Sequence, residues 1–265
     1  MTRIDRIVSW AAIVTLTLAA PQLARGQGGA LGRGSSAMHD HDYLTARREL
    51  EQAVREQPDS YEANWRLAMA LVNIGLQTPD EQKSPTRDSL YAHAESYARR
   101  AVAAKPSGAD GHFALGTAVG RASLTVGTRQ RIKRAAEIYN EARTAIELDP
   151  RHDGAYHLLG RWHAEIMRLS ALQKFFAKTF LGAEIFDQAS WDEAEHNLRT
   201  AVTLDPTRIF HRLDLATVLV DRERWREAKA QVDTLVTLPP IEPMDLNYRR
   251  QAMALGGRIA SKLKP

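Results

Sequence analysis

Small residues and prolines recur at a fixed spacing along most of this chain of 265 residues. In Ser190–Pro206, Ala194 is followed seven residues later by Ala201 and twelve residues later by Pro206. Helices pack closely where the residues between them are small, and proline cannot continue a helix, so the spacing predicts a packed helix that ends in a turn. Four other segments share the spacing, although one begins with isoleucine and one keeps only the alanine and the proline: Ala46–Pro58, Ala94–Pro106, Ile138–Pro150 and Ala228–Pro240.

A second predicted helix precedes most of these segments. Ahead of Trp191, the stretch Tyr156–Gly160 places an aromatic residue, a leucine and a glycine at helical spacing. Paired short helices that recur about every 34 residues are the pattern of a tetratricopeptide repeat. We therefore predict an all-α fold, a tetratricopeptide-repeat superhelical solenoid over residues 43–265, in which Asp245–Lys262 is a C-terminal capping helix.

The segment ahead of the first predicted helix is rich in glycine and serine. Its composition predicts a flexible linker over residues 27–42, which would leave the helix Tyr43–Gln57 as a half repeat that caps the N-terminal end. His39–Asp42 alternates histidine with aspartate, a pattern that can hold a metal ion or mark the start of a helix. We favour the helix start, because acidic residues are stabilising near a helix N-terminus.

Residues 1–26 have the pattern of a secretory signal peptide. Arg3 and Arg6 give a basic start, Ile7–Ala20 is a mainly apolar run of 14 residues, and small residues flank Arg25. We predict cleavage after Gly26 and export to the periplasm or the medium. An uncleaved N-terminal anchor is the alternative.

An insertion over Ile166–Gln188 separates the two helices of the fourth repeat and contains a predicted helix, Ile166–Leu181. Four apolar residues fall on one face of that helix, and Lys174 and Lys178 fall on the polar side. The helix either folds back over the concave groove or the repeat core, or docks on a partner or an acidic membrane surface. The four apolar residues are Leu169, Leu172, Phe176 and Phe180.

Three stretches around this insertion resemble the regulator of microtubule dynamics family: Leu159–Trp162, Leu169–Gly182 and Trp191–Ala194. The resemblance implies an extra helix between the two helices of this repeat and implies no catalytic residues. Members from eukaryotes are associated with microtubules, mitochondria and membrane contacts, and some with lipid binding. The export signal resembles a bacterial one, so we do not transfer a tubulin partner to this chain.

The first helix of each repeat lines the concave face of such a solenoid. Its inward positions predict a groove that is apolar and aromatic at both ends, with a basic centre at Arg121 and Arg161. Such a groove suits a peptide with carboxylates, and equally an acyl chain with an acidic head group. Trp65 and Phe113 are also compatible with simple packing between helices. The predicted groove residues are Trp65, Met69, Phe113, Thr117, Arg121, His157, Arg161, Phe210, Leu213 and Thr217.

Signatures of enzymes are missing from the sequence. The nine histidines form no HExxH motif, the chain has no cysteine, and no phosphate-binding glycine loop follows a predicted strand. The balance of 36 basic against 32 acidic residues does not indicate nucleic acid as a partner. We predict a non-catalytic protein–protein interaction scaffold of the cell envelope, without metal or cofactor. The alternative is a carrier of lipid or another apolar ligand in the same groove.

Overall fold

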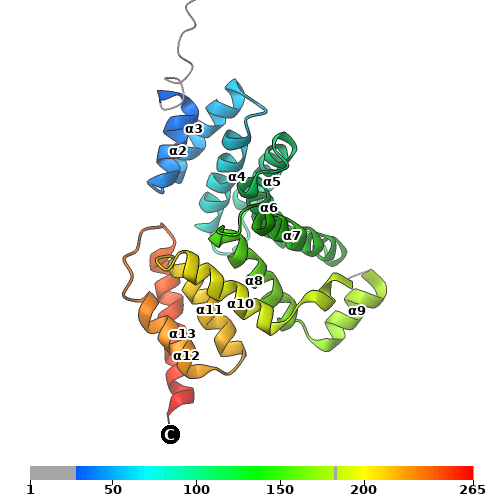
Figure 1. Ribbon diagram of the computed structural model, residues 1–265, viewed down its shortest axis with the longest axis vertical. Helices are drawn as coiled ribbons and strands as arrows, with labels where there is room; N and C mark the ends of the chain where they lie inside the picture. Colours follow the sequence, from blue (N-terminus) through cyan, green and yellow to red (C-terminus); the bar gives the residue numbers. More distant parts are fainter. Residues whose placement is uncertain (1–27, 81, 182–183, 265) are drawn as a thin grey trace, which may run out of the picture.

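The computed structural model describes residues 28–80, 82–181 and 184–264 of the chain. These residues form twelve α-helices, labelled α2 to α13, and no strand (Figure 1). The predicted signal peptide over residues 1–26 lies outside the described residues. Within the described residues, no helix combines the length and the apolar character that crossing a membrane requires.

Ten of these helices form five pairs, and each pair packs on the next pair along the chain. The confirmed fold is therefore an all-α tetratricopeptide-repeat solenoid. The pairs are α2 (Ala30–His39) with α3 (Tyr43–Glu56), α4 (Tyr61–Leu76) with α5 (Pro85–Ala104), α6 (Ala109–Ala122) with α7 (Thr128–Leu148), α8 (Asp153–Arg168) with α10 (Trp191–Leu204), and α11 (Ile209–Asp221) with α12 (Trp225–Leu235).

The recurring small residues lie where the helices touch. Ala194 and Ala201 are fully buried on α10, and the equivalent alanines of α3 and α5 are buried as well. A Cβ atom on Gly160 of α8 would lie 2.8 Å from Leu198 Cγ and 3.1 Å from the backbone oxygen of Ala194. Close packing of α8 on α10 therefore requires glycine at this position, as the spacing predicted.

Side chains at the helix starts satisfy backbone N–H groups that have no partner within the helix. Ser60, Ser84 and Ser190 each accept a hydrogen bond from the backbone N–H three residues later. Asp42 does the same for Thr45 at 3.1 Å, which confirms the helix-start interpretation of His39–Asp42. These caps fix where α3, α4, α5 and α10 begin.

The predicted linker over residues 27–42 is wrong, because residues 30–39 form the helix α2. Ala30 and Ala37 are buried, and a Cβ on Gly34 would lie 2.6 Å from Leu50 Cγ on α3. Glycine and alanine here let two helices pack closely, as they do in the later repeats. The predicted N-terminal half repeat is therefore a complete helix pair.

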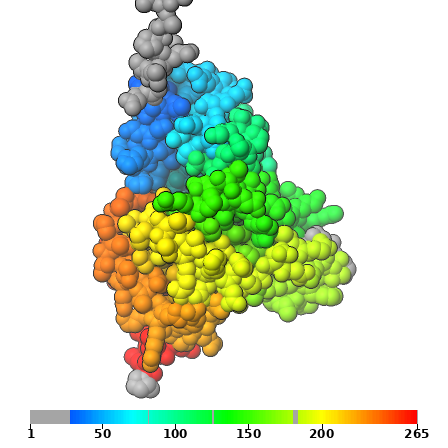
Figure 2. All heavy atoms as spheres, in the orientation of Figure 1, coloured from blue at the N-terminus to red at the C-terminus, as the bar shows by residue number. Residues whose placement is uncertain are grey.

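The last helix, α13 (Asp245–Leu263), packs on α12 and α11 and caps the array. Ala252 and Ile259 are fully buried in this contact. The chain also curves so far that the turn between α2 and α3 approaches the loop ahead of α13 (Figure 1). Glu242, in the loop ahead of α13, lies close enough to Tyr43 and His41 to interact electrostatically with both side chains. In Figure 2 the first helices border the loop ahead of α13.

The inserted helix is shorter than predicted. Ile166 belongs to α8 and is buried, and the separate helix α9 spans Ala171–Leu181, followed by the 3-10 helix η3 (Glu184–Gln188). α9 contacts α7 and η3 and projects from the side of the molecule (Figure 1). Another 3-10 turn, η2 (Ser123–Thr125), precedes α7.

Candidate functional site

The predicted groove residues divide into a partly exposed set and a buried pair. His157 and Leu213 are buried, and the other eight predicted residues are partly exposed. Leu213 packs in the C-terminal core, whereas Asp214, one residue later, contacts α8. Leu213 is therefore wrong as a groove residue, and Asp214 takes its place. Asp214 follows Phe210 by four residues, so helical spacing from Phe210 could have identified it.

The aromatic residues near the N-terminal half of the face also serve the packing. Trp65 and Met69 pack against the first core cluster. Phe113 stacks on His152 with ring centroids 4.6 Å apart, and a Cβ on Gly154 would lie 2.7 Å from the Phe113 ring. The packing role considered for Trp65 and Phe113 is thus present, and both side chains keep a partly exposed surface.

Four side chains form a continuous hydrogen-bonded chain between α8 and α11. His211 Nε2 lies 2.9 Å from Asp153 Oδ2, and His211 Nδ1 lies 3.0 Å from His157 Nδ1. His157 Nε2 in turn lies 3.1 Å from Asp214 Oδ2. Both imidazoles are buried, and their rings are 4.8 Å apart between centroids. We call this chain the paired-histidine centre.

The geometry of the paired-histidine centre fixes where two of its ring hydrogens lie. A ring nitrogen that faces a carboxylate must carry hydrogen, which places N–H groups on both Nε2 atoms. Only one of the two facing Nδ1 atoms can carry hydrogen if the central bond is to form. The two aspartates thus flank the histidine pair and fix a hydrogen on each Nε2 atom.

Burial and neighbouring charges shift the titration of three of these groups. Burial lowers the pKa of His157 to about 4, although its bond to Asp214 opposes the shift. Burial disfavours ionisation of Asp153, but the His211 hydrogen bond and the Arg208 charge outweigh it and lower its pKa to about 2. The pKa of Asp214 falls still further, because Arg161 and His157 outweigh its burial. At neutral pH the low pKa of His157 leaves its ring neutral, with hydrogen on Nε2 toward Asp214 and an electron pair on Nδ1 toward His211.

Two arginines flank the centre, and both are ion-paired. Arg161 Nε lies 3.5 Å from Asp214 Oδ2, and Arg208 Nε lies 3.4 Å from Asp153 Oδ2. Farther along the face, Arg121 Nη1 lies 3.5 Å from Asp80 Oδ2. The predicted basic centre is therefore wrong: carboxylates from other elements neutralise it. The sequence interpretation missed them because Asp214 and Asp80 come from a different helix and from the loop after α4.

Residues near the C-terminus complete the lining. Arg208 Nη1 lies 3.4 Å from Glu242 Oε1, and the Phe210 ring lies 6.2 Å from that of Tyr248 on α13. Burial raises the pKa of Tyr248 to about 12, so its hydroxyl stays protonated and can donate a hydrogen bond. Aromatic surfaces and paired charges of both signs thus surround the buried histidines.

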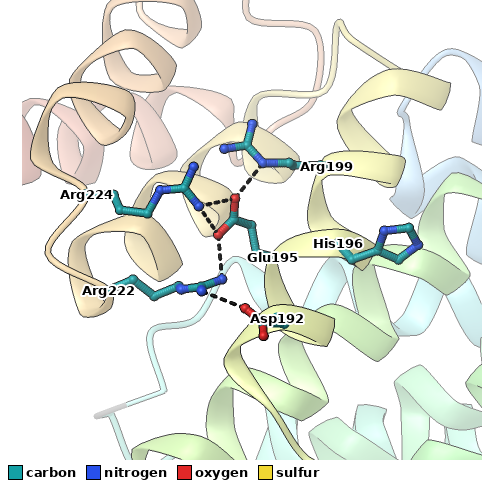
Figure 3. A pocket seen from close by; sticks show the side chains of 6 residues that line it. All are labelled: Asp192, Glu195, His196, Arg199, Arg222 and Arg224. Carbon is teal, nitrogen blue, oxygen red and sulfur yellow. Dashed lines mark hydrogen bonds and ion pairs between the residues drawn. The ribbon is translucent and has the colours of Figure 1, made fainter.

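A shallow hollow of about 250 Å³ lies between α10 and the turn that joins α11 to α12. Figure 3 shows three arginines converging on Glu195 from these elements. Glu195 is buried, and its carboxylate accepts hydrogen bonds from Arg199, Arg222 and Arg224. The same arginines also pair with Asp192 and Glu227. Because every guanidinium is neutralised, we interpret the cluster as an ion-pair network that holds two repeats together, and we call it the glutamate staple. The sequence analysis did not predict it.

The inserted helix does not cover the groove. Leu169 and Ala177 pack on the core beside α7 and α8, but Leu172 is 63% exposed and Phe176 is 50% exposed. Phe175, on the flank of the predicted stripe, is 58% exposed. The side chain of Phe180 lies outside the described residues. The apolar face predicted to fold back is thus mostly on the surface.

A family model and a curated relative both relate this chain to the regulator of microtubule dynamics proteins. A family model described as "Regulator of microtubule dynamics protein 1-3" matches residues 34–257, which is more than half of the chain. Regulator of microtubule dynamics protein 1 of Mus musculus is 26% identical over 172 residues, which cover 62% of this chain and 54% of the mouse protein. The chain thus spans about half the length of this curated relative.

A similar solved structure has the same architecture. TTC0263, a thermophilic TPR protein in Thermus thermophilus, is 22% identical to this chain. Their TM-score is 0.61, and the match covers 85% of this chain and 96% of that protein. At this level of identity the likeness supports the fold alone.

Proposed function

Because this chain belongs to the regulator of microtubule dynamics family and folds as a tetratricopeptide-repeat solenoid, we propose that it is a non-catalytic scaffold. Its partner is a protein segment held in the concave face, and its setting is the cell envelope. The observation that carries the proposal is the lining around the paired-histidine centre. Partly exposed ion pairs lie there beside partly exposed aromatic rings, which together suit the mixed chemistry of a polypeptide.

The ion pairs at the centre favour a peptide over an acyl chain. Arg161 and Asp214 keep 42% and 25% of their side chains exposed, so each retains hydrogen-bonding capacity toward a bound segment. A protein segment offers both donors and acceptors to such a pair. A hydrocarbon chain would leave the two charges desolvated without new partners, which is costly. An apolar-ligand carrier should instead copurify with lipid, which extraction and mass spectrometry of the purified protein would detect.

The hydrogen bonds of the centre argue against acid–base catalysis there. Each histidine uses one ring nitrogen for an aspartate and the other for its partner histidine. Neither ring therefore has a nitrogen left to accept or deliver a substrate proton. We propose that the histidines hold α8 and α11 in register and position Arg161 and Asp214 for recognition.

A charge reversal in the face tests the scaffold proposal. Arg161→Glu places a carboxylate beside Asp214, so capture of the partner from cells should weaken about tenfold or more in a quantitative pull-down. Arg143→Glu is the matched control, because Arg143 lies on α7 and is an exposed arginine paired with Glu147. Equal capture by both variants would contradict binding in the concave face.

The envelope location rests on the sequence of residues 1–26. Mass spectrometry of protein recovered from an export-competent cell should show a mature chain that begins at Gln27. Recovery of the intact N-terminus in the membrane fraction would support the uncleaved anchor in its place.

A further inference from the structure

One side of the molecule exposes apolar side chains that the concave face does not use. It consists of α9 and the first turns of α7, which contact each other and project together from the body (Figures 1 and 2). Leu172 and Phe175 are among the most exposed large apolar residues of the described chain, and Phe176 packs edge-on against Phe175. Leu124, in the turn ahead of α7, is 40% exposed as well. We call this region the α7–α9 corner.

The same corner gathers cations. Arg129, Arg131 and Lys133 are exposed on the first turns of α7, and neither residues 128–136 nor α9 contain an acidic residue. Cations are disfavoured near the positive end of a helix, and Gly127 supplies no side-chain cap there. The cations at the start of α7 thus destabilise the helix, and an external anion bound there would offset their repulsion from the helix dipole.

Some cations of the corner are paired with carboxylates and others are not. Lys178 is bound to Asp187 of η3, and Arg134 is bound to Glu95 of α5. Lys174 Nζ lies 3.7 Å from the thioether sulfur of Met167, and Arg131 donates to the backbone oxygen of Ser123. Lys174 and Arg131 thus differ from Arg161 and Arg208 in the concave face, which both contact carboxylates. The corner therefore keeps a local positive field.

We propose that the α7–α9 corner docks on the surface of an anionic lipid bilayer. Phe175 and Leu172 enter the boundary between head groups and acyl chains, while the cations of α7 and Lys174 contact lipid phosphates. Apolar side chains on a lysine-bearing helix have this chemistry at interfaces, and each cation near an anionic leaflet strengthens binding. A protruding tip suits a flat surface, whereas the anchor residues of protein interfaces usually fill pockets.

This proposal extends beyond the scaffold function, because it leaves the concave face free. When this chain is docked on a bilayer through the corner, its concave face can still hold a bound protein segment. The first helix pairs take no part in the membrane contact. The corner would thereby place the scaffold at a membrane surface without a spanning helix in the described residues.

Vesicle flotation tests the proposal. The purified protein, with every variant in the same N-terminal form, is mixed with vesicles of phosphatidylcholine alone or of phosphatidylcholine with phosphatidylglycerol in equal amounts. We expect binding to the anionic vesicles that weakens with added salt and is much lower on phosphatidylcholine alone. Binding that is the same on both vesicles would overturn the proposal.

Matched variants locate the binding surface. Replacing Arg129, Arg131 and Lys133 by Gln should lower vesicle affinity about fivefold for each cation removed. Leu172→Ser with Phe175→Ser should lower it about tenfold or more. The controls are Leu44→Ser with Met253→Ser, which are equally exposed elsewhere, and a triple change to Gln at Arg48, Arg143 and Lys229.

The outcomes of this series separate a lipid surface from a protein surface. If corner variants and controls bind vesicles equally well, the corner is not the docking site. If corner variants keep vesicle binding but lose a protein partner, the corner is a protein surface and the proposal is wrong. Circular dichroism melts of each variant establish that the compared proteins are folded.

Discussion

The paired-histidine centre buries polar side chains, whereas the α7–α9 corner exposes apolar ones. At the centre, two buried histidines and two partly exposed aspartates lie between α8 and α11, and each has a hydrogen-bonding partner. At the corner, phenylalanine and leucine lie on the surface beside cations, where neither α9 nor the first turns of α7 carry an acidic residue. The centre lies between the first helices of two repeats, whereas the corner consists of the inserted helix α9 and the first turns of α7. We therefore expect the centre to stabilise the fold and the exposed side chains of the corner to contribute little to it.

The largest difference should appear when the centre loses His211. His211→Ala removes a fully buried ring and leaves Asp153 and His157 without their hydrogen-bonding partner. We expect the free energy of unfolding to fall by about 3–5 kcal/mol in urea titrations. The control is His196→Ala, an exposed histidine on α10 that should change stability by no more than about 0.5 kcal/mol. Similar losses in both variants would contradict the assignment of His211.

The pH dependence of stability should be next in size. The pKa of His157 is about 4 in the fold against an ordinary 6.5, so the unfolded chain binds more protons between these values. Stability is full above pH 6.5 and falls as the pH drops toward 4, by about 3 kcal/mol for a shift of this size. His163, whose pKa burial also lowers, adds to the same trend.

A variant assigns this pH dependence to its source. His157→Gln keeps a polar side chain but does not titrate, so the urea midpoint should vary less between pH 6.5 and pH 4 than it does in the parent. An unchanged pH profile would show that another group controls stability in this range.

A glycine substitution tests the packing of α8, the helix that carries His157, on α10. Gly160→Ala places a methyl group 2.8 Å from Leu198 and 3.1 Å from the α10 backbone, and should cost about 1–3 kcal/mol. Gly257→Ala is the control, because nothing lies within 4 Å of a Cβ there. Alanine favours a helix interior over glycine, so Gly257→Ala should stabilise α13 by up to about 1 kcal/mol. The opposite order of stabilities in thermal melts would contradict the packing of α8 on α10.

The smallest effect on stability should come from the corner. Leu172→Ser with Phe175→Ser removes only exposed apolar surface. The free energy of unfolding, measured by urea titration, should therefore change by no more than about 0.5 kcal/mol per residue. A loss as large as that of His211→Ala would mean that these side chains are part of the core. The comparison between the two regions would then fail.

Spacing within the chain predicted the helix pairs, because an alanine seven residues before another marks a close helix contact wherever it occurs. Composition misled at α2, since glycine and alanine there pack against Leu50 and its neighbours as the later small residues do. The centre was only partly predicted: His157 and Arg161 follow from helical spacing, but His211 lies 54 residues from His157 and nothing local connects them. For α9, periodicity identified an apolar stripe; whether another element covers it depends on tertiary packing.

The glutamate staple shows the same limit. Glu195, Arg222 and Arg224 are separated by a repeat boundary and meet only after α10 packs on α11. Charged residues on a helix are usually solvent-exposed, so nothing local in the sequence indicates that Glu195 is buried. Resemblance was more informative than spacing for the insertion, because the family includes an extra helix that general repeat positions do not predict.

Photocrosslinking in the exporting cell tests the central claim of partner binding most directly. Benzoylphenylalanine at Phe210 places the probe beside His157 and Tyr248 in the concave face, and the same probe at Leu148 lies on the exposed end of α7. The scaffold account predicts a discrete protein crosslink at Phe210 that Arg161→Glu removes and that is absent at Leu148. An identical crosslink from both positions, or one at Phe210 that survives Arg161→Glu, would contradict it.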